Sequence, residues 1–211
     1  MREILEVPKA ALDIEEPWTA PARCRPVPLR RATDGSHPRL RTHVAAWYDE
    51  DYLSILFSGA DDHIRATYLR HDDPLYEEDV VEVFVAPNDA ARYYELEINP
   101  RGTMFDAQVE SPDGVRATMH VDRGWTCEGL FAAVRTTAEG GRLQAIDILV
   151  RIPFFALERS TPGFGETWRA NFFRIDRHSD LGDEFMSWQP SLKSPADFHV
   201  VSAFGTLRFV E

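Results

Sequence analysis

The stretch PLYEEDVVEVFVAPNDAARYYELEINPRG, residues 74–102, decides the fold of this chain. Successive residues of a strand face opposite sides of a sheet, so Val81, Val83 and Val85 form one face of a first predicted strand. The sequence Pro-Asn-Asp at 87–89 is typical of a turn. These features predict two antiparallel strands joined by a short connection.

Three glutamates lie on these two strands where the alternation would place core side chains. Glu82 projects from the first strand together with Val80 and Phe84, so it is an acid among apolar neighbours. The second strand has Tyr93, Glu95, Glu97 and Asn99 on one face and Tyr94, Leu96 and Ile98 on the other.

Pairing of the two strands would bring Glu82 beside the polar face that carries Glu95 and Glu97. The three carboxylates are then candidates for one binding site or one catalytic site. The alternative is that all three are solvated or ion-paired strand residues, because acids usually lie at the surface.

The rest of the chain repeats the pattern of short strands separated by turns. The segments THVAAWY and YLSILFS flank an acidic turn at 49–51, and Gly140-Gly141 joins two further alternating runs, so both predict hairpins. The segment IPFFALER at 152–159 is the best helix candidate. Further strand candidates are IRATYL, DVVEVFVA, RYYELEIN, TMFDAQVE, LFAAVRTT, RLQAIDILVRI, TWRANFFRID and GTLRFVE. This pattern predicts an all-β antiparallel sandwich or open barrel.

Length and composition favour one globular domain over residues 1–211. The chain has 211 residues, of which 44% are hydrophobic and 27% charged, and these values suit a single well-buried core. Residues 1–40 are rich in proline and show little periodicity, so we expect an extended segment packed on a sandwich formed by residues 41–211.

Charge and cysteine content exclude several classes of partner. A net charge of -12 disfavours nucleic acid and anionic membrane surfaces, and it fits neutral ligands better. Cys24 and Cys127 lack the spacing of a zinc or redox motif, and one disulfide between them stays open. The first residues do not form a signal peptide, so we expect a cytoplasmic protein as written, or an extracellular or periplasmic one if a leader was removed.

The order of motifs resembles the family 9 carbohydrate-binding modules within the wider DOMON-like group. The resemblance covers the chain from about Thr42 to its end, and its matching segments are DPLYEEDVVEVFVAP, YYELEINPRGTMFDA, IPF, TWRANFFRID, MSWQP and FHVVSAFGTLRF. The resemblance implies a jelly-roll or immunoglobulin-like β-sandwich with short helical connections. It also implies non-catalytic binding of a neutral mono- or oligosaccharide, including chain ends, at one end of the sandwich.

In that family a sugar lies between aromatic rings while charged and amide side chains bind its hydroxyls. The residues of this chain at the matching positions are Tyr76, Glu82, Glu95, Glu97, Asn99, Arg174, Trp188, Phe198 and His199. Tyr76 and Phe198 stand where well-studied modules have tryptophan, and their smaller rings offer less area for stacking on a pyranose. The well-studied members are also appendages of secreted hydrolases.

Structural roles and other functions compete with sugar binding. Arg174 is a candidate to pair with Glu82 and hold the sheets together, while Trp188, Phe198 and Tyr76 are candidates for the core. A glycoside hydrolase would use Glu82 with Glu95 or Glu97 as its carboxyl pair. A haem-binding domain would draw on the axial ligands Met104, Met119 and His120.

Calcium is the cofactor that the acidic loops suggest, and related modules carry structural calcium. The candidate loops are residues 49–51, 61–62, 72–73 and 180–184. None has the spacing of an EF-hand, so solvated turn acids are the alternative interpretation.

Overall fold

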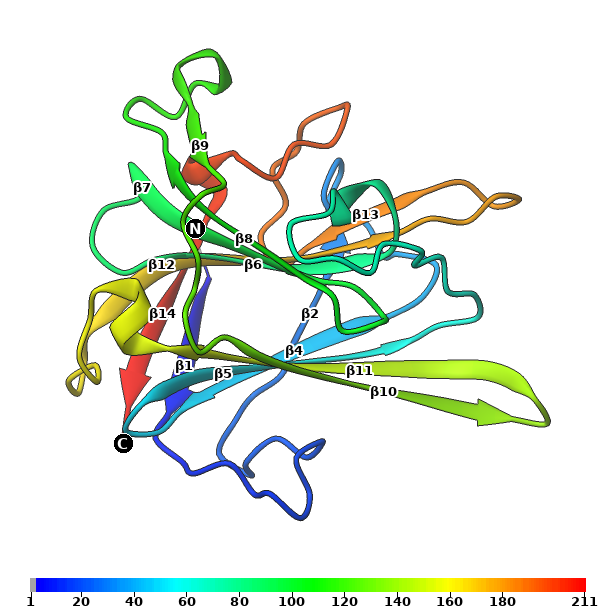
Figure 1. The fold of residues 1–211 in the computed structure, drawn as a ribbon, viewed down its shortest axis with the longest axis horizontal. Coiled ribbons are helices and arrows are strands. Elements are labelled where there is room, and N and C mark those ends of the chain that lie inside the picture. The colour runs from blue at the N-terminus through cyan, green and yellow to red at the C-terminus, as the bar shows by residue number, and fades with distance from the viewer. Residues whose placement is uncertain (1–2) are drawn as a thin grey trace.

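Two β-sheets face each other in a sandwich, as Figure 1 shows for the computed structural model, which describes residues 3–211. The order of the large sheet is β1-β14-β12-β6-β7-β8-β9, with β13 beside β12 and β3 beside β13. Its strands are β1 (Ile4–Pro8), β3 (Arg30–Arg31), β6 (Val80–Ala86), β7 (Arg92–Ile98), β8 (Met104–Glu110), β9 (His120–Asp122), β12 (Thr167–Asp176), β13 (Glu184–Ser187) and β14 (Gly205–Val210).

The small sheet has the order β10-β11-β5-β4-β2. Its strands are β2 (Val27–Pro28), β4 (Thr42–Tyr48), β5 (Tyr52–Ala60), β10 (Phe131–Glu139) and β11 (Arg142–Pro153). Short 3-10 helices lie at η1 (Leu75–Glu77), η2 (Arg116–Thr118), η3 (Phe154–Leu157) and η4 (Val201–Ala203). The predicted all-β sandwich is therefore confirmed, and the structure is not a closed barrel.

The three predicted hairpins form as expected. In the β6–β7 pair Val83 lies opposite Leu96, and Glu82 lies directly opposite Glu97. Strands β4 and β5 pair around the acidic turn. Strands β10 and β11 meet at Gly140 and Gly141, whose φ angles of 57° and 79° belong to the left-handed region that a tight hairpin turn requires.

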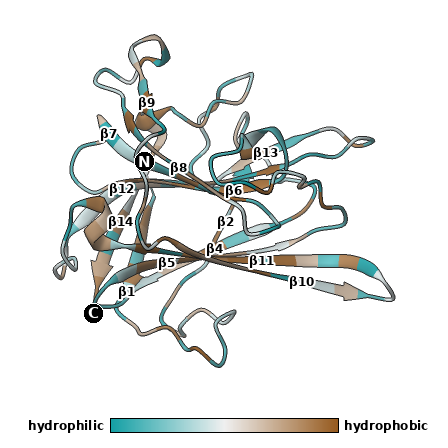
Figure 2. Ribbon diagram, in the orientation of Figure 1, coloured by the Kyte–Doolittle hydropathy of each residue, from teal (hydrophilic) through white to brown (hydrophobic). Residues whose placement is uncertain are grey.

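The main core lies between the two sheets. Val81, Val83 and Val85 of β6 pack there with Leu96 and Ile98 of β7, and all five side chains are buried. Figure 2 shows hydrophobic colouring along the strands of both layers. Each such side chain contributes roughly 1.5–3 kcal/mol by leaving water, so this face determines which way the alternation of each strand points.

The large sheet is also buried on its outer face, away from the small sheet. A second apolar cluster there contains Phe84, Phe105, Phe173 and Phe204, and Leu75 of η1 packs against it. In Figure 1 the loops around β9 and before β14 rise from this side of the sheet. They provide the walls of the site described below.

Two predicted segments differ from expectation. Residues 64–69 form a loop rather than a strand, because two carboxylates bind their backbone donors: Asp79 accepts from the Arg65 N–H at 2.6 Å, and Glu78 accepts from the Thr67 N–H. The helix candidate at 152–159 is only the short 3-10 turn Phe154–Leu157 after the end of β11.

The N-terminal segment is partly a strand of the large sheet. Ile4–Pro8 forms β1, which pairs in parallel with β14, so this part does more than wrap the sandwich. Cys24 and Cys127 are free thiols in separate apolar clusters, which answers the open question of a disulfide between them. Within residues 3–211 no helix is long and apolar enough to cross a membrane.

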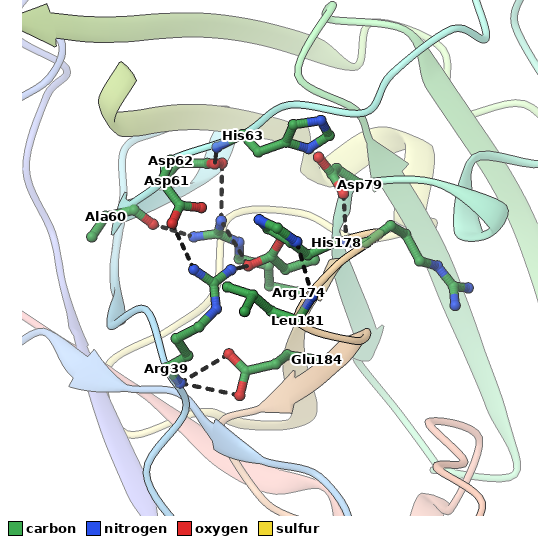
Figure 3. Close-up of polar contacts among 12 residues, drawn as sticks. Arg39, Ala60, Asp61, Asp62, His63, Asp79, Arg174, His178, Leu181 and Glu184 are labelled. Atoms are coloured by element: carbon green, nitrogen blue, oxygen red, sulfur yellow. Dashed lines mark hydrogen bonds and ion pairs between the residues drawn. The ribbon is translucent and has the colours of Figure 1, made fainter. Parts of the chain in front are cut away.

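Arg174 of β12 joins the two sheets through a buried ion pair. Its guanidinium donates to Asp61 at 3.0 Å, to the Thr42 hydroxyl at 2.8 Å and to the Ala60 carbonyl at 3.0 Å (Figure 3). The side chains of Arg174 and Asp61 are only 5% and 3% exposed. Arg174 thus binds residues of the small sheet and not Glu82.

A second arginine extends this ion-pair network to the segment before β4. Arg39 pairs with Asp62 at 2.7 Å and with Asp176 at 3.1 Å, and its backbone N–H donates to both oxygens of Glu184 (Figure 3). Gly59 lies inside the network, where an added Cβ would come 2.6 Å from the Thr42 hydroxyl and 2.7 Å from the Arg174 guanidinium. Each acid of this network thus binds Arg39 or Arg174, and Gly59 leaves the space that these side chains need.

We predict that Arg174→Ala lowers the free energy of unfolding by about 3–5 kcal/mol, because it leaves Asp61 buried without its partner. Urea unfolding followed by tryptophan fluorescence measures the change. The double variant Arg174→Met with Asp61→Leu should recover most of the loss, since both charges are then gone. A double variant no more stable than the single one would contradict a buried pair as the cause.

Candidate functional site

A pocket of about 680 Å³ opens on the outer face of the large sheet. Its floor comes from outward-facing side chains of β6, β7 and β8, and from Ile175 near the end of β12. Its walls come from Tyr76, from residues 116–123 and from residues 193–199. Segments far apart in sequence thus meet over the face that carries the second apolar cluster.

Three glutamates form the polar part of the floor. Glu82 and Glu97 are direct cross-strand partners, and Glu95 lies two residues before Glu97 on the same face. One carboxylate oxygen from each lies within 4.8 Å of the others. Their exposed fractions are 2%, 6% and 1% for Glu82, Glu95 and Glu97. The pairing that the alternation predicted therefore brings all three carboxyls together.

Burial dominates the electrostatics of this group. Desolvation raises the pKa of Glu82 well above the ordinary value, and the nearby charge of Glu95 raises it further. Desolvation raises the pKa of Glu97 in the same way, with added repulsion from Glu82 and Glu95. Burial also raises the pKa of Glu95 to about 7. The three groups therefore influence one another's titration and hold protons at higher pH than exposed glutamates do.

The cationic side chains on the walls have partners or neighbours outside this group. Arg116 pairs with Asp197 at 2.9 Å. Arg177 pairs with Asp183 at 2.5 Å. The Arg123 guanidinium lies 5.7 Å from the centroid of the Phe105 ring. Arg116 and Arg123 lower the pKa of Glu95 at longer range and Arg177 lowers that of Glu82, and all three arginines line the same pocket.

Aromatic side chains also line the pocket. Tyr76 is 37% exposed on η1, where the buried Leu75 anchors the turn and Arg177 donates to the Tyr76 carbonyl at 2.7 Å. Phe198 is 9% exposed and stacks on Phe173 with ring centroids 4.2 Å apart. Tyr76 therefore offers the freest ring, and Phe198 is largely part of the outer cluster.

His199 lies between the outer cluster and the acids. Its Nδ1 is hydrogen-bonded to the Tyr93 hydroxyl at 2.6 Å, and its Nε2 lies 3.8 Å from Glu95. Burial lowers the pKa of His199 to about 4, and the charge of Arg116 lowers it further. The imidazole is therefore neutral near pH 7 and provides little positive charge for Glu95.

Three of the nine predicted site residues, Arg174, Trp188 and Asn99, do not line this pocket. Arg174 points into the sandwich because β12 alternates with Phe172 inward and Phe173 outward. Trp188 stacks on Phe172 in the main core with centroids 5.5 Å apart. The Asn99 amide binds the backbone of its own turn and the carbonyl of Tyr68.

The remaining six predicted residues line the pocket together: Tyr76, Glu82, Glu95, Glu97, Phe198 and His199. The sequence interpretation did not assign to a sugar site the wall residues Arg116, Met119, Arg123, Arg177 and Lys193. A signal existed for Arg177, which lies three residues after Arg174 and therefore on the opposite face of an extended strand. The loop residues carried no such signal.

The acidic loops proposed for calcium mostly have partners in the protein. Asp49 accepts two turn N–H groups and pairs with Arg151, and Asp61 and Asp62 pair with arginines. Among the described residues, two groups have the geometry to hold a metal ion. They are His71 with Asp72 and Asp106, and the pocket group Glu82, Glu95 and Glu97.

The structure does not assemble the suggested haem ligands. Met104 packs against the main core, whereas Met119 packs against the outer cluster on the other side of the large sheet. His120 is exposed on β9.

Comparison with known proteins assigns the family. The model of carbohydrate-binding family 9 matches residues 33–209. The chain belongs to carbohydrate-binding family 9. No curated protein matches this family 9 chain.

Solved structures share the fold of this family 9 chain. A protein from Bacteroides uniformis ATCC 8492, proposed to bind carbohydrate, has 19% sequence identity and a TM-score of 0.69, over 99% of this chain and 100% of its own. A family 9 carbohydrate-binding module from Caldicellulosiruptor kristjanssonii was solved with cellotriose, at 11% identity and a TM-score of 0.63, covering 99% and 94% of the two chains. A family 9 module from the same organism, solved with glucose, has 13% sequence identity and a TM-score of 0.65, over 98% of this chain and 95% of its own.

We predict that the stability of this family 9 chain falls less with rising pH when one floor acid is removed. The folded state holds its protons above pH 4.5, whereas the unfolded carboxyls lose theirs, so the free energy of unfolding falls as the pH rises from about 4.5 through 7. In Glu97→Gln this fall should be smaller by at least about 1 kcal/mol. Urea unfolding at pH 5 and pH 8 in buffer with chelator provides the measurement.

The matched control for this comparison is Glu110→Gln, an exposed acid at the end of β8. The free energy of unfolding of this variant should change between pH 5 and pH 8 as it does in the unsubstituted protein. If Glu97→Gln and Glu110→Gln lose stability with pH equally, the floor acids do not carry raised pKa values.

Proposed function

We propose that the outer pocket binds a neutral mono- or oligosaccharide, including chain ends, without chemical conversion. The observation that carries the proposal is the combination of an exposed ring, Tyr76, with buried carboxyl groups and arginine side chains in one cavity. Family membership and the sugar complexes of modules with the same fold support it.

The ring and the polar groups match the two sides of a pyranose. A sugar has apolar C–H faces, and Tyr76 offers a flat surface for one of them. Its hydroxyls donate to carboxylates such as Glu82 and accept from guanidinium groups such as Arg177. The cavity volume of about 680 Å³ lies within the range of small-molecule sites.

We predict that Tyr76→Ala weakens sugar binding about five- to tenfold, since stacking on a ring contributes about 1–1.5 kcal/mol. Calorimetric titration with glucose, cellobiose and cellotriose measures the affinity. Phe164→Ala is the control, because Phe164 is 75% exposed and lies outside the pocket. Equal affinities of both variants and the unsubstituted protein would place the sugar elsewhere.

We predict that Glu82→Gln weakens sugar binding roughly two- to tenfold, because the amide cannot accept at both of its terminal atoms and an ordinary hydrogen bond contributes about 0.5–1.5 kcal/mol. The same titrations apply, with Glu110→Gln as the control. Arg174→Lys should leave the affinity unchanged, because Arg174 faces the small sheet.

Chromatography of the sugars after incubation separates binding from hydrolysis. Unchanged oligosaccharide supports a binding module. Turnover that Glu82→Gln abolishes would instead establish the pair of carboxyls as a hydrolase site.

A further inference from the structure

We infer that Glu82, Glu95 and Glu97 together bind one hard divalent cation, Ca²⁺ in the first place, at the floor of the outer pocket. The inference goes beyond sugar binding, because it concerns the floor acids themselves and needs no sugar in the pocket.

The strand pairing forces the acids together. Glu82 and Glu97 are directly opposite on β6 and β7, and Glu95 is on the same face one pleat away. Side chains at directly opposite positions have Cβ atoms roughly 4.5–5.5 Å apart, and like charges there destabilise a sheet. One oxygen of each acid lies within 4.8 Å of the others, which matches the spacing of ligands around a single ion. The backbone alone thus preorganises three oxygen ligands.

The chain provides no counterion inside this group. Among residues 3–211, no Lys, Arg or His nitrogen lies within 4.0 Å of a carboxylate oxygen of Glu82 or Glu97. The nearest such contact of the group is His199 with Glu95 at 3.8 Å. The contrast with Asp61, which is equally buried but paired with Arg174 at 3.0 Å, shows how this fold compensates an acid when it uses its own residues.

Glu97 points to a ligand by itself. Its side chain is 1% exposed and lines the pocket, yet neither of its oxygens receives a hydrogen bond from a donor of the described chain. Its one partner within reach is the Glu95 carboxylate, to which Glu97 can donate only while it keeps a proton of its own. A bound cation would satisfy these oxygens without that proton.

The ligand set selects the class of ion. Three carboxylates are hard oxygen ligands, which suit Ca²⁺, Mg²⁺ and Mn²⁺ better than zinc or copper. Ca²⁺ takes six to eight oxygens in flexible geometry, so its remaining positions would be filled from the open pocket by water or hydroxyls. Three carboxylates and one divalent ion leave a single negative charge, which Arg116 and Arg123 on the walls offset.

A second group provides an internal comparison. His71, Asp72 and Asp106 also lie close enough to hold an ion, but His71 and Asp72 are exposed. Asp106 already accepts the Cys127 N–H at 3.1 Å and lies 3.6 Å from His71. Substitution in this group therefore distinguishes a specific pocket site from acids that attract ions at the surface.

The test is calorimetric titration of CaCl₂, MgCl₂ and MnCl₂ into chelator-treated protein without sugar, together with thermal unfolding. We expect a saturable site for Ca²⁺ and a rise in Tm of roughly 5–10 °C at a hundredfold excess over Kd. Glu97→Gln and Glu82→Gln should weaken Ca²⁺ binding at least tenfold. Both replacements keep the shape of the side chain, so folding is checked by the Tm in chelator.

Asp72→Asn and Glu110→Gln are the control variants and should bind Ca²⁺ as the unsubstituted protein does. The inference is overturned if no ion binds below millimolar concentration, in which case a shared proton satisfies the group. It is also overturned if Asp72→Asn removes the binding, or if Glu97→Gln leaves it unchanged.

Sugar titrations with and without chelator then connect the two proposals. A cation at the floor would present open coordination positions to sugar hydroxyls, so chelator should weaken sugar binding. Ion binding without sugar binding would leave the metal site standing and refute the proposed function. Sugar binding without ion binding would leave the proposed function standing and refute the metal site.

Discussion

The inner face of the large sheet must pack against the small sheet, and this requirement determines which side chains point to the outer face of the large sheet. Once Val81, Val83 and Val85 are buried between the sheets, Glu82 has to point outward, because successive strand residues alternate. The same holds for Glu95 and Glu97 beside Leu96 and Ile98. The position of the acids is therefore a consequence of the hydrophobic core.

The molecule handles buried acids in two different ways. Between the sheets, Asp61 and Asp176 lie beside Arg174 and Arg39, so each negative charge has a guanidinium within 3.1 Å. In the outer pocket, Glu82 and Glu97 have no such partner in the described chain. The first arrangement holds two sheets together, and the second leaves binding capacity for something that the chain does not supply.

Much of the fold was predictable from local pattern, because alternation and turns are local properties. The β6–β7 pair follows from valines at every second position and a proline-containing turn, and it brings the three glutamates together. The pairing of β1 with β14 was not predictable in this way, since a parallel contact between the two chain ends leaves no local signal in a five-residue strand.

The composition of the site was predictable only where one face was clearly apolar. In β12 the adjacent Phe172 and Phe173 pack on opposite sides of the sheet, so the sequence gives no sign of which phenylalanine faces the main core. The orientation of this strand decides whether Arg174 or Arg177 reaches the pocket, and in the structure it is Arg177. Arg116 begins the 3-10 helix η2 and Arg123 directly follows β9, and no periodicity in the sequence places either of them at the pocket.

The uncompensated acids lower the stability of the fold. Burying a carboxylate without a partner is costly, and three at adjacent positions add mutual repulsion. An isosteric glutamine would remove the charge and the mutual repulsion while keeping the side-chain shape, and the outer cluster around Phe84 and Phe105 already provides the packing that the sheet needs. Glutamates at these positions thus reduce stability without serving the core. Such a cost is characteristic of residues whose partner is a ligand, and it separates the floor of the pocket from the paired acids around Arg174.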